Sequence, residues 1–275
     1  MEPGDVERYR EFDPPPHLRP FVRTIWTYGC ARPSATVQRI APDGCPELVL
    51  HVGTPYAEQH PDDILRPQPT AVFVGQMTRP IALRPLGPVE LVAVRFEPDG
   101  ARDWLGQRLD LATDRRLDVA DRLGGLTPPS GDPAAQVEAV VQWLDTGQRR
   151  TPWAIDPAVR ETIQAMASDR SGPALLPGAR RALQRRFADR VGVSPRMLRS
   201  IFRFRRVFDH AGYPGQTDTG WLEAGLGAGY FDQPQMARDF RRFLGCTATE
   251  WAREQSELAR AIASQTYKSG ALQLP

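Results

Sequence analysis

Lysine, cysteine and histidine are all scarce in this chain of 275 residues, which has one lysine and three cysteines. The cysteines, Cys30, Cys45 and Cys246, are far apart and form no C-x-x-C pair, which argues against a disulfide framework or a zinc site. No apolar run approaches the roughly 20 residues of a membrane span, and the first thirty residues are charged and proline-rich, unlike a signal peptide. We therefore expect a cytoplasmic protein without a membrane partner.

The four histidines, His17, His51, His60 and His210, are isolated from one another. A metal-dependent barrel enzyme needs clustered histidines or a similar set of ligands, and the sequence has no H-x-H motif. It also pairs no nucleophile with a base and contains no glycine-rich phosphate loop. These absences argue against an enzyme, and we expect neither a metal nor a cofactor.

Charge is divided unevenly along the chain. Residues 1–150 contain 17 arginines and 21 acidic residues, a net of −4, whereas residues 151–275 contain 17 arginines, one lysine and 12 acidic residues, a net of +6. Ten arginines lie between Gly178 and Arg206, with Asp189 as the single acid there. Such a concentration predicts a surface that binds phosphate groups, and an ordinary solvated helix face is the alternative.

The first half has the pattern of a β protein. Short apolar runs rich in β-branched and aromatic residues alternate with turns that contain glycine or proline, which favours a barrel or a sandwich. The runs are residues 21–28, 47–52, 71–74, 81–83 and 90–96. Short helices are expected at 101–105 and 119–123.

An amphipathic helix is predicted after Asp132-Pro133, which supplies an N-cap and a proline at the first helical position. Its apolar positions share one face, and we expect the helix to end at Gly147. This face either packs on the β core, which we favour, or forms a dimer seam. The positions are Val137, Val140, Val141 and Leu144.

Residues 148–157 are expected to be a linker, and everything after them is predicted to be helical. Helices are expected from Pro157, from about Arg180 to Arg190, from Pro195 to His210, over 221–227, over 233–244 and from Thr249. Ser194 suits an N-cap and Pro195 the first helical position.

Residues 229–245, GYFDQPQMARDFRRFLG, resemble the second helix-turn-helix of AraC-type transcription regulators. Residues 182–195, ALQRRFADRVGVSP, resemble the end of that family's first recognition helix and the turn after it. The likeness covers residues 155–255, and the first half more loosely resembles the family's cupin-like sensor domains. It implies an α+β multidomain protein, with a cupin-like β-barrel and accessory helices at 1–147 and an all-α double helix-turn-helix domain at 155–265.

The resemblance implies a transcription regulator that binds double-stranded DNA through two recognition helices. Arginine, glutamine and asparagine make bidentate contacts with base edges, and neighbouring arginines contact phosphates. The candidates for base contact are Arg181, Gln184, Arg185, Gln233, Gln235 and Arg238. The candidates for phosphate contact are Arg199, Arg203, Arg206, Arg241 and Arg242. Leu183, Phe187, Met236 and Phe240 are expected to face inward.

The first half is expected to bind a small-molecule effector in an apolar pocket. The candidate pocket residues are Trp26, Tyr28, His51, Phe73, Gln76, Arg95 and Phe96. Arg95 would either hold an acidic effector or, the reading we favour, be exposed or structurally paired. Strand alternation cannot be phased from the sequence, so about half of these side chains are expected to face away from the pocket.

Two partners remain open at this stage, RNA polymerase and a second copy of the chain. A second function also remains open, because residues 171–179, SGPALLPGA, contain Pro173, Pro177 and Gly178 where the family has a scaffold helix. If this shortened first unit no longer reads DNA, the protein would be a co-regulator or antagonist that binds another protein.

Overall fold

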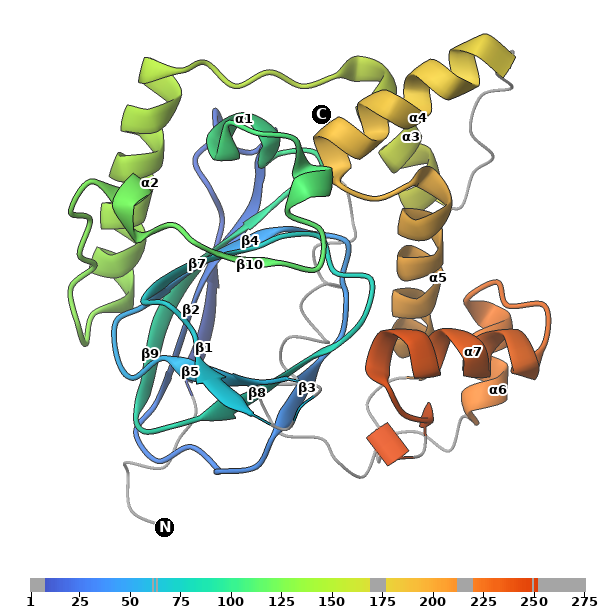
Figure 1. Ribbon diagram of the computed structural model, residues 1–275, viewed down its shortest axis with the longest axis horizontal. Coiled ribbons are helices and arrows are strands. Elements are labelled where there is room, and N and C mark those ends of the chain that lie inside the picture. Colours follow the sequence, from blue (N-terminus) through green and yellow to red (C-terminus); the bar gives the residue numbers. More distant parts are fainter. Residues whose placement is uncertain are drawn as a thin grey trace.

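A computed structural model describes residues 8–60, 62, 64–168, 177–211, 220–248 and 250–251. It consists of a β-rich N-terminal part followed by a helical C-terminal part, which lie side by side in Figure 1. This confirms the predicted α+β architecture. Within the described residues, no helix is both long and apolar enough to cross a membrane.

The strands form two antiparallel sheets that face each other. The larger sheet has the order β1-β2-β9-β4-β7-β10 and the smaller has the order β3-β8-β5-β6. The larger sheet consists of β1 (Arg8–Phe12), β2 (Val22–Cys30), β9 (Val89–Phe96), β4 (Glu47–His51), β7 (Ala71–Val74) and β10 (Arg116–Asp118). The smaller consists of β3 (Gln38–Ile40), β8 (Ile81–Pro85), β5 (Tyr56–Gln59) and β6 (Leu65–Pro67).

The larger sheet is buried on both faces. Because side chains alternate along a strand, Ile25 points to one face of the sheet and Trp26 to the other. Ile25 belongs to a core that the sheet shares with helix α2 (Pro133–Arg150), whereas Trp26 belongs to the core between the two sheets. Both long strands, β2 and β9, are accordingly buried along almost their whole length.

Short helices and one long helix cover the outer face of the larger sheet (Figure 1). They are α1 (Arg102–Leu105), the 3-10 turns η1 (Leu109–Leu111) and η2 (Ala120–Leu123), and α2 (Pro133–Arg150). The Asp132 side chain caps α2 as predicted, by accepting hydrogen bonds from the Ala134 and Ala135 amides. The apolar stripe of α2 packs on the sheet core, in agreement with the favoured interpretation.

Helix α2 continues past Gly147 to Arg150, so the predicted end of this helix was wrong. Glycine in a helix interior costs only about 1 kcal/mol relative to alanine, and the residues that follow, Gln148, Arg149 and Arg150, are good helix formers. A short irregular segment at 151–156 then leads to the helical part.

The helical part contains α3 (Pro157–Ala167), α4 (Pro177–Val191), α5 (Pro195–Ala211), α6 (Trp221–Gly227) and α7 (Gln233–Leu244). Phe187 joins α3, α4 and the start of α5 into one small core, and Leu183 packs against it. Met236 and Phe240 lie in a second core with the end of α5 and α6. All four side chains therefore face inward, as the sequence predicts.

The two parts of the molecule are joined by polar contacts at several points. Arg160 on α3 donates to the carboxylate of Asp99, at 2.7 Å, and to the Pro20 carbonyl oxygen at 2.6 Å. Arg190 at the end of α4 donates to Asp103 at 3.0 Å. The Thr113 hydroxyl donates to a carbonyl oxygen in the turn between α4 and α5, that of Gly192, at 2.5 Å.

An apolar contact at Gly44 joins the same two parts. Gly44 has a φ of +86° and lies in the loop between β3 and β4. A Cβ atom at this position would come within 2.7 Å of Phe202 Cε1 and 3.0 Å of Leu198 Cδ1, both on α5. Only glycine satisfies both the backbone angle and this close approach.

We expect Gly44→Ala to lower the free energy of unfolding by about 2–5 kcal/mol, because it adds a left-handed backbone penalty to a steric clash with α5. Gly124→Ala is the matched control, since Gly124 also has positive φ (57°) but nothing lies within 4 Å of its Cβ position. This control should lose only about 1–2 kcal/mol. Denaturant unfolding measures both. Equal losses in the two variants would show that α5 does not press on residue 44.

Candidate functional site

The first half of α4 presents a basic and amide-bearing surface. Arg181, Gln184 and Arg185 are all exposed, while Phe187 on the other side of the helix is fully buried. Of residues 171–179, where the family has a scaffold helix, 171–176 lie outside the described residues and 177–179 belong to α4.

The start of α7 is fixed by hydrogen bonds at its N-terminus. The carboxylate of Asp232 accepts from the amide of Gln235 at 2.7 Å, and the Gln235 side-chain oxygen accepts from the Phe231 amide at 3.1 Å. Gln235 is half-buried in this arrangement, whereas Gln233 and Arg238 are exposed. Helix α7 packs against α6 across a turn at Gly229, where φ is +89°.

The five arginines predicted to contact phosphate have different surroundings. Arg199, Arg241 and Arg242 are exposed. Arg203 is half-buried: it donates to Asp239 at 2.8 Å and lies over the Tyr230 ring at 4.4 Å. Arg206 is also half-buried, and it donates to the Met166 carbonyl oxygen at 3.4 Å. Arg203 and Arg206 therefore contribute to packing between helices.

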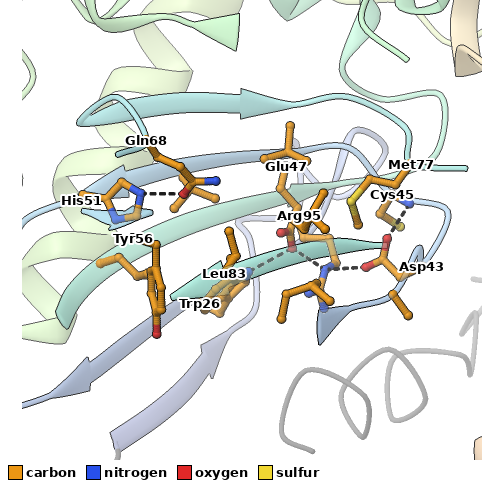
Figure 2. A pocket seen from close by; sticks show the side chains of 16 residues that line it. Trp26, Asp43, Cys45, Glu47, His51, Tyr56, Gln68, Met77, Leu83 and Arg95 are labelled. Atoms are coloured by element: carbon orange, nitrogen blue, oxygen red, sulfur yellow. Dashed lines mark hydrogen bonds and ion pairs between the residues drawn. The ribbon is translucent and has the colours of Figure 1, made fainter. Parts of the chain in front are cut away.

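A cavity of about 60 Å³ lies between the two sheets (Figure 2). Most of its wall is apolar or aromatic, and polar groups gather at two places. Figure 2 shows His51 and Tyr56 toward one end of the cavity, and Arg95, Asp43 and Cys45 toward the other. The wall residues are Trp26, Ile40, Ala41, Asp43, Cys45, Glu47, Val49, His51, Tyr56, Gln68, Val74, Met77, Ile81, Leu83, Leu91 and Arg95.

Arg95 is the charged centre of one end of the cavity. Its side chain is only 2% exposed, and its Nε atom lies 2.7 Å from Glu47 Oε1 and 3.2 Å from Asp43 Oδ2. Burial acts to lower the pKa of Arg95, but the two carboxylates outweigh it and raise that pKa, so the guanidinium stays charged. Arg95 is thus structurally paired, which agrees with the favoured interpretation of this residue.

Glu47 links this charge to the cavity wall. It lies opposite Arg95 in the pairing of β4 with β9, and it also accepts a hydrogen bond from Trp26 Nε1 at 3.2 Å. Burial raises the pKa of the Glu47 carboxyl, although Arg95 acts in the opposite direction. The strand register therefore brings a carboxylate, a guanidinium and an indole to one site.

His51 and Gln68 form the second polar place in the cavity. His51 Nε2 lies 3.2 Å from Gln68 Oε1, and both side chains are buried. Burial lowers the pKa of His51, so the imidazole is neutral at pH 7. Its other nitrogen, Nδ1, is buried and has no hydrogen-bond partner within the part of the chain that the structure describes.

The structure brings three of the seven predicted effector residues to the cavity, namely Trp26, His51 and Arg95. Tyr28 belongs to the same core between the sheets but does not line the cavity. Phe73 and Phe96 point to the opposite face of the larger sheet and pack with α2 and Trp104, so they are placed away from the cavity by strand alternation.

Gln76 has a different position again. It follows β7, and its side-chain Nε2 donates to the Gly44 carbonyl oxygen at 2.7 Å. Gln76 thus fixes the loop whose neighbouring residues, Asp43 and Cys45, line the cavity while Gly44 itself touches α5. Gln76 therefore stabilises this loop and does not itself line the cavity.

Several cavity residues were not predicted from the sequence. Asp43 and Cys45 belong to a Pro-Asp-Gly-Cys segment whose pattern is that of a turn, and Gln68 lies between two prolines. The sequence does contain a signal for Glu47. It is the only charged residue of the apolar run 47–52, and Arg95 is a charged residue within the apolar run 90–96. Two opposite charges in neighbouring buried strands would be expected to pair.

Among the described residues, no group of three or more His, Cys, Asp or Glu side chains is arranged to hold a metal ion.

Comparisons with known proteins extend over both parts of the chain. Residues 10–118 match the model of a family described as a domain of unknown function, DUF6597. No curated protein matches the sequence. A solved structure of ToxT from Vibrio cholerae is similar, with 8% identity, 91% of this chain and 98% of that chain covered, and a TM-score of 0.44. Wild-type ToxT from the same organism with an unsaturated fatty acid bound has 8% identity, 93% and 98% coverage, and a TM-score of 0.43.

We expect Arg203→Ala to destabilise the protein by about 1–3 kcal/mol, because it leaves the half-buried Asp239 carboxylate without its cation and removes a contact with Tyr230. Arg199→Ala, four residues earlier on the same helix, changes an exposed side chain and is the matched control, with an expected change within about 0.5 kcal/mol. Urea unfolding followed by circular dichroism gives both values. If Arg203→Ala is as stable as the unchanged protein, the contacts of Arg203 with Asp239 and Tyr230 do not stabilise the fold. Arg203 would then again be a candidate for phosphate contact.

Proposed function

We propose that this protein is an AraC-type transcription regulator that binds double-stranded DNA with α4 and α7 as its two recognition helices. The observation that carries the proposal is that both helices bury apolar side chains and expose arginine and glutamine within their first nine residues. On α4 the exposed residues are Arg181, Gln184 and Arg185, and on α7 they are Gln233 and Arg238. We propose no catalytic activity.

These side chains have the chemistry that base recognition requires. Arginine makes a bidentate contact with guanine and glutamine with adenine, and both are read in the major groove, which admits a helix. Exposed arginines nearby, Arg199 on α5 and Arg241 and Arg242 on α7, would supply the phosphate contacts that dominate affinity.

The spacing of the two helices also supports the proposal. Helix α5 joins them, and its 17 residues span about 25 Å at 1.5 Å per residue. Figure 1 shows α4 beyond one end of α5 and α7 beside the other. Recognition helices that enter the major groove on one side of DNA lie about 34 Å apart, and a connecting helix of this length, with its flanking turns, suits that separation.

The cavity is proposed to be the sensor. Asp43 and Cys45 line it, and Gly44 between them touches Phe202 on α5. A ligand that shifts the 43–45 loop would therefore act directly on α5, the helix between the two proposed recognition helices. Such a ligand changes DNA affinity to the extent that it binds one arrangement of the loop and α5 better than another.

We expect Arg181→Ala and Arg238→Ala each to weaken binding to the preferred DNA sequence by about 1–3 kcal/mol and to relax specificity at one position. Fluorescence anisotropy with DNA from the promoter region of the protein's own gene measures this, with a scrambled duplex for comparison. Arg149→Ala is the matched control, because Arg149 is an exposed arginine on α2, in the other part of the molecule. It should bind as tightly as the unchanged protein.

The loss of DNA affinity in each of the two variants shows which helices recognise the DNA sequence. A loss in both variants supports two working recognition helices, and a loss with Arg238→Ala alone confines DNA reading to α7. Absence of sequence preference in the unchanged protein at every salt concentration would contradict the proposal and favour a co-regulator that binds another protein.

Arg241→Ala and Arg242→Ala are expected to act differently from the base-contact variants. Each should weaken binding to specific and scrambled DNA alike, and each should reduce the slope of log K against log salt concentration by about 1. Titrations at several salt concentrations give the slopes. An unchanged slope in both variants would place these arginines away from the phosphates.

A further inference from the structure

We infer that the cavity between the sheets takes a small, uncharged molecule that carries a hydroxyl group, and that it discriminates against carboxylates. The inference rests on the proposed function in one respect only, which is that the cavity is the sensor site. Its support is the pairing of Arg95, the geometry of His51 and the size and lining of the cavity.

At the charged end of the cavity, one guanidinium faces two carboxyl groups, so this end attracts an anionic ligand poorly. Arg95 Nε already faces Glu47 and Asp43, at 2.7 Å and 3.2 Å. The carboxyl groups of Asp43 and Glu47 thus approach the same nitrogen of this guanidinium. A ligand carboxylate would therefore lose its hydration and meet a guanidinium that protein carboxyl groups already pair, which is unfavourable in a buried site.

A second, half-buried arginine nearby does not change this balance. Arg23 donates to both oxygens of Glu97, at 3.3 Å and 3.1 Å, and it is not among the residues that line the cavity. Each guanidinium at this end of the cavity thus already has a carboxylate of its own.

At the other end of the cavity, His51 has a nitrogen atom that lacks a hydrogen-bond donor among the described residues. Gln68 Oε1 is a carbonyl oxygen and can only accept, so His51 Nε2 carries the proton of their 3.2 Å contact. In a neutral imidazole the other nitrogen is then an acceptor. Nδ1 is buried without a partner among the described residues, and the side chain is 92% buried. His51 lines the cavity, and a ligand hydroxyl is the neutral donor that would satisfy its Nδ1 atom.

The dimensions of the cavity restrict the ligand further. Its volume of about 60 Å³ is well below the roughly 150 Å³ of an apolar cavity that accepts benzene. A short alcohol fits with the walls as they stand. A single phenolic ring fits if two flexible side chains at the wall, Met77 and Leu83, change rotamer.

Three fluorinated rings of nearly equal size provide the test: 4-fluorophenol, fluorobenzene and 4-fluorobenzoate. Fluorine NMR of the probes at pH 7, with the full-length protein, measures weak binding directly. We expect 4-fluorophenol to bind at least fivefold more tightly than fluorobenzene, because one buried hydrogen bond is gained. We expect 4-fluorobenzoate to bind more weakly than either. Tighter binding of the benzoate, or equal binding of phenol and fluorobenzene, would overturn the inference.

His51→Leu locates the hydroxyl. It should reduce the affinity for 4-fluorophenol to that of fluorobenzene, while fluorobenzene itself binds as before and so reports that the cavity has remained folded. His60→Leu is the matched control, because His60 lies outside the cavity wall, and it should leave the preference intact. If His51→Leu keeps the full preference for phenol, the hydroxyl is bound elsewhere and the inference fails.

The outcome is separable from that of the DNA experiments. Selective binding of 4-fluorophenol by a protein that shows no DNA preference would leave the cavity inference standing and remove the proposed function. Sequence-specific DNA binding by a protein that binds 4-fluorobenzoate best would do the reverse.

Discussion

The buried ion pair between Arg95 and its two carboxylates is the interaction on which most of the arrangement depends. A guanidinium that is 2% exposed must be neutralised and hydrogen-bonded, and here the partners come from β4 and from the loop before it. This requirement fixes Asp43, and Asp43 in turn fixes its neighbour Gly44 against α5. The buried ion pair in the β part is thereby connected, through two adjacent residues, to a contact with a helix in the other part.

The sequence predicts the helices and long strands of this protein better than its short strands. The helix starts at Asp132 and Asp156 are correct because an aspartate followed by proline is a strong local signal. The strands β1, β3, β5, β6 and β10 were missed because they are three to five residues long and largely polar or proline-containing. Their pairing comes from the neighbouring strand, which no local pattern reveals.

The candidate site was predictable only in part, and strand phase is the reason. Trp26, His51 and Arg95 line the cavity, whereas Phe73 and Phe96 have the same character in sequence but point to the opposite face. In a sheet that is buried on both faces, apolar residues alternate with apolar residues, so hydrophobicity cannot say which set faces inward. The proposed recognition helices, α4 and α7, are different: their buried and exposed faces differ in chemistry, and periodicity alone separates Phe187 from Arg185.

The contact at Gly44 has a consequence for modular construction. Regulators with separate sensor and reader parts invite domain exchange, in which one sensor is fused to another reader at the linker. In this chain the irregular segment at 151–156 is not the only connection between the two parts, because Phe202 and Leu198 of α5 lie close to Gly44, which has no side chain. A chimera cut at the linker would combine a loop and a helix surface that were not fitted to each other. Residues 41–45 and the first half of α5 should therefore be transferred together as one unit of exchange.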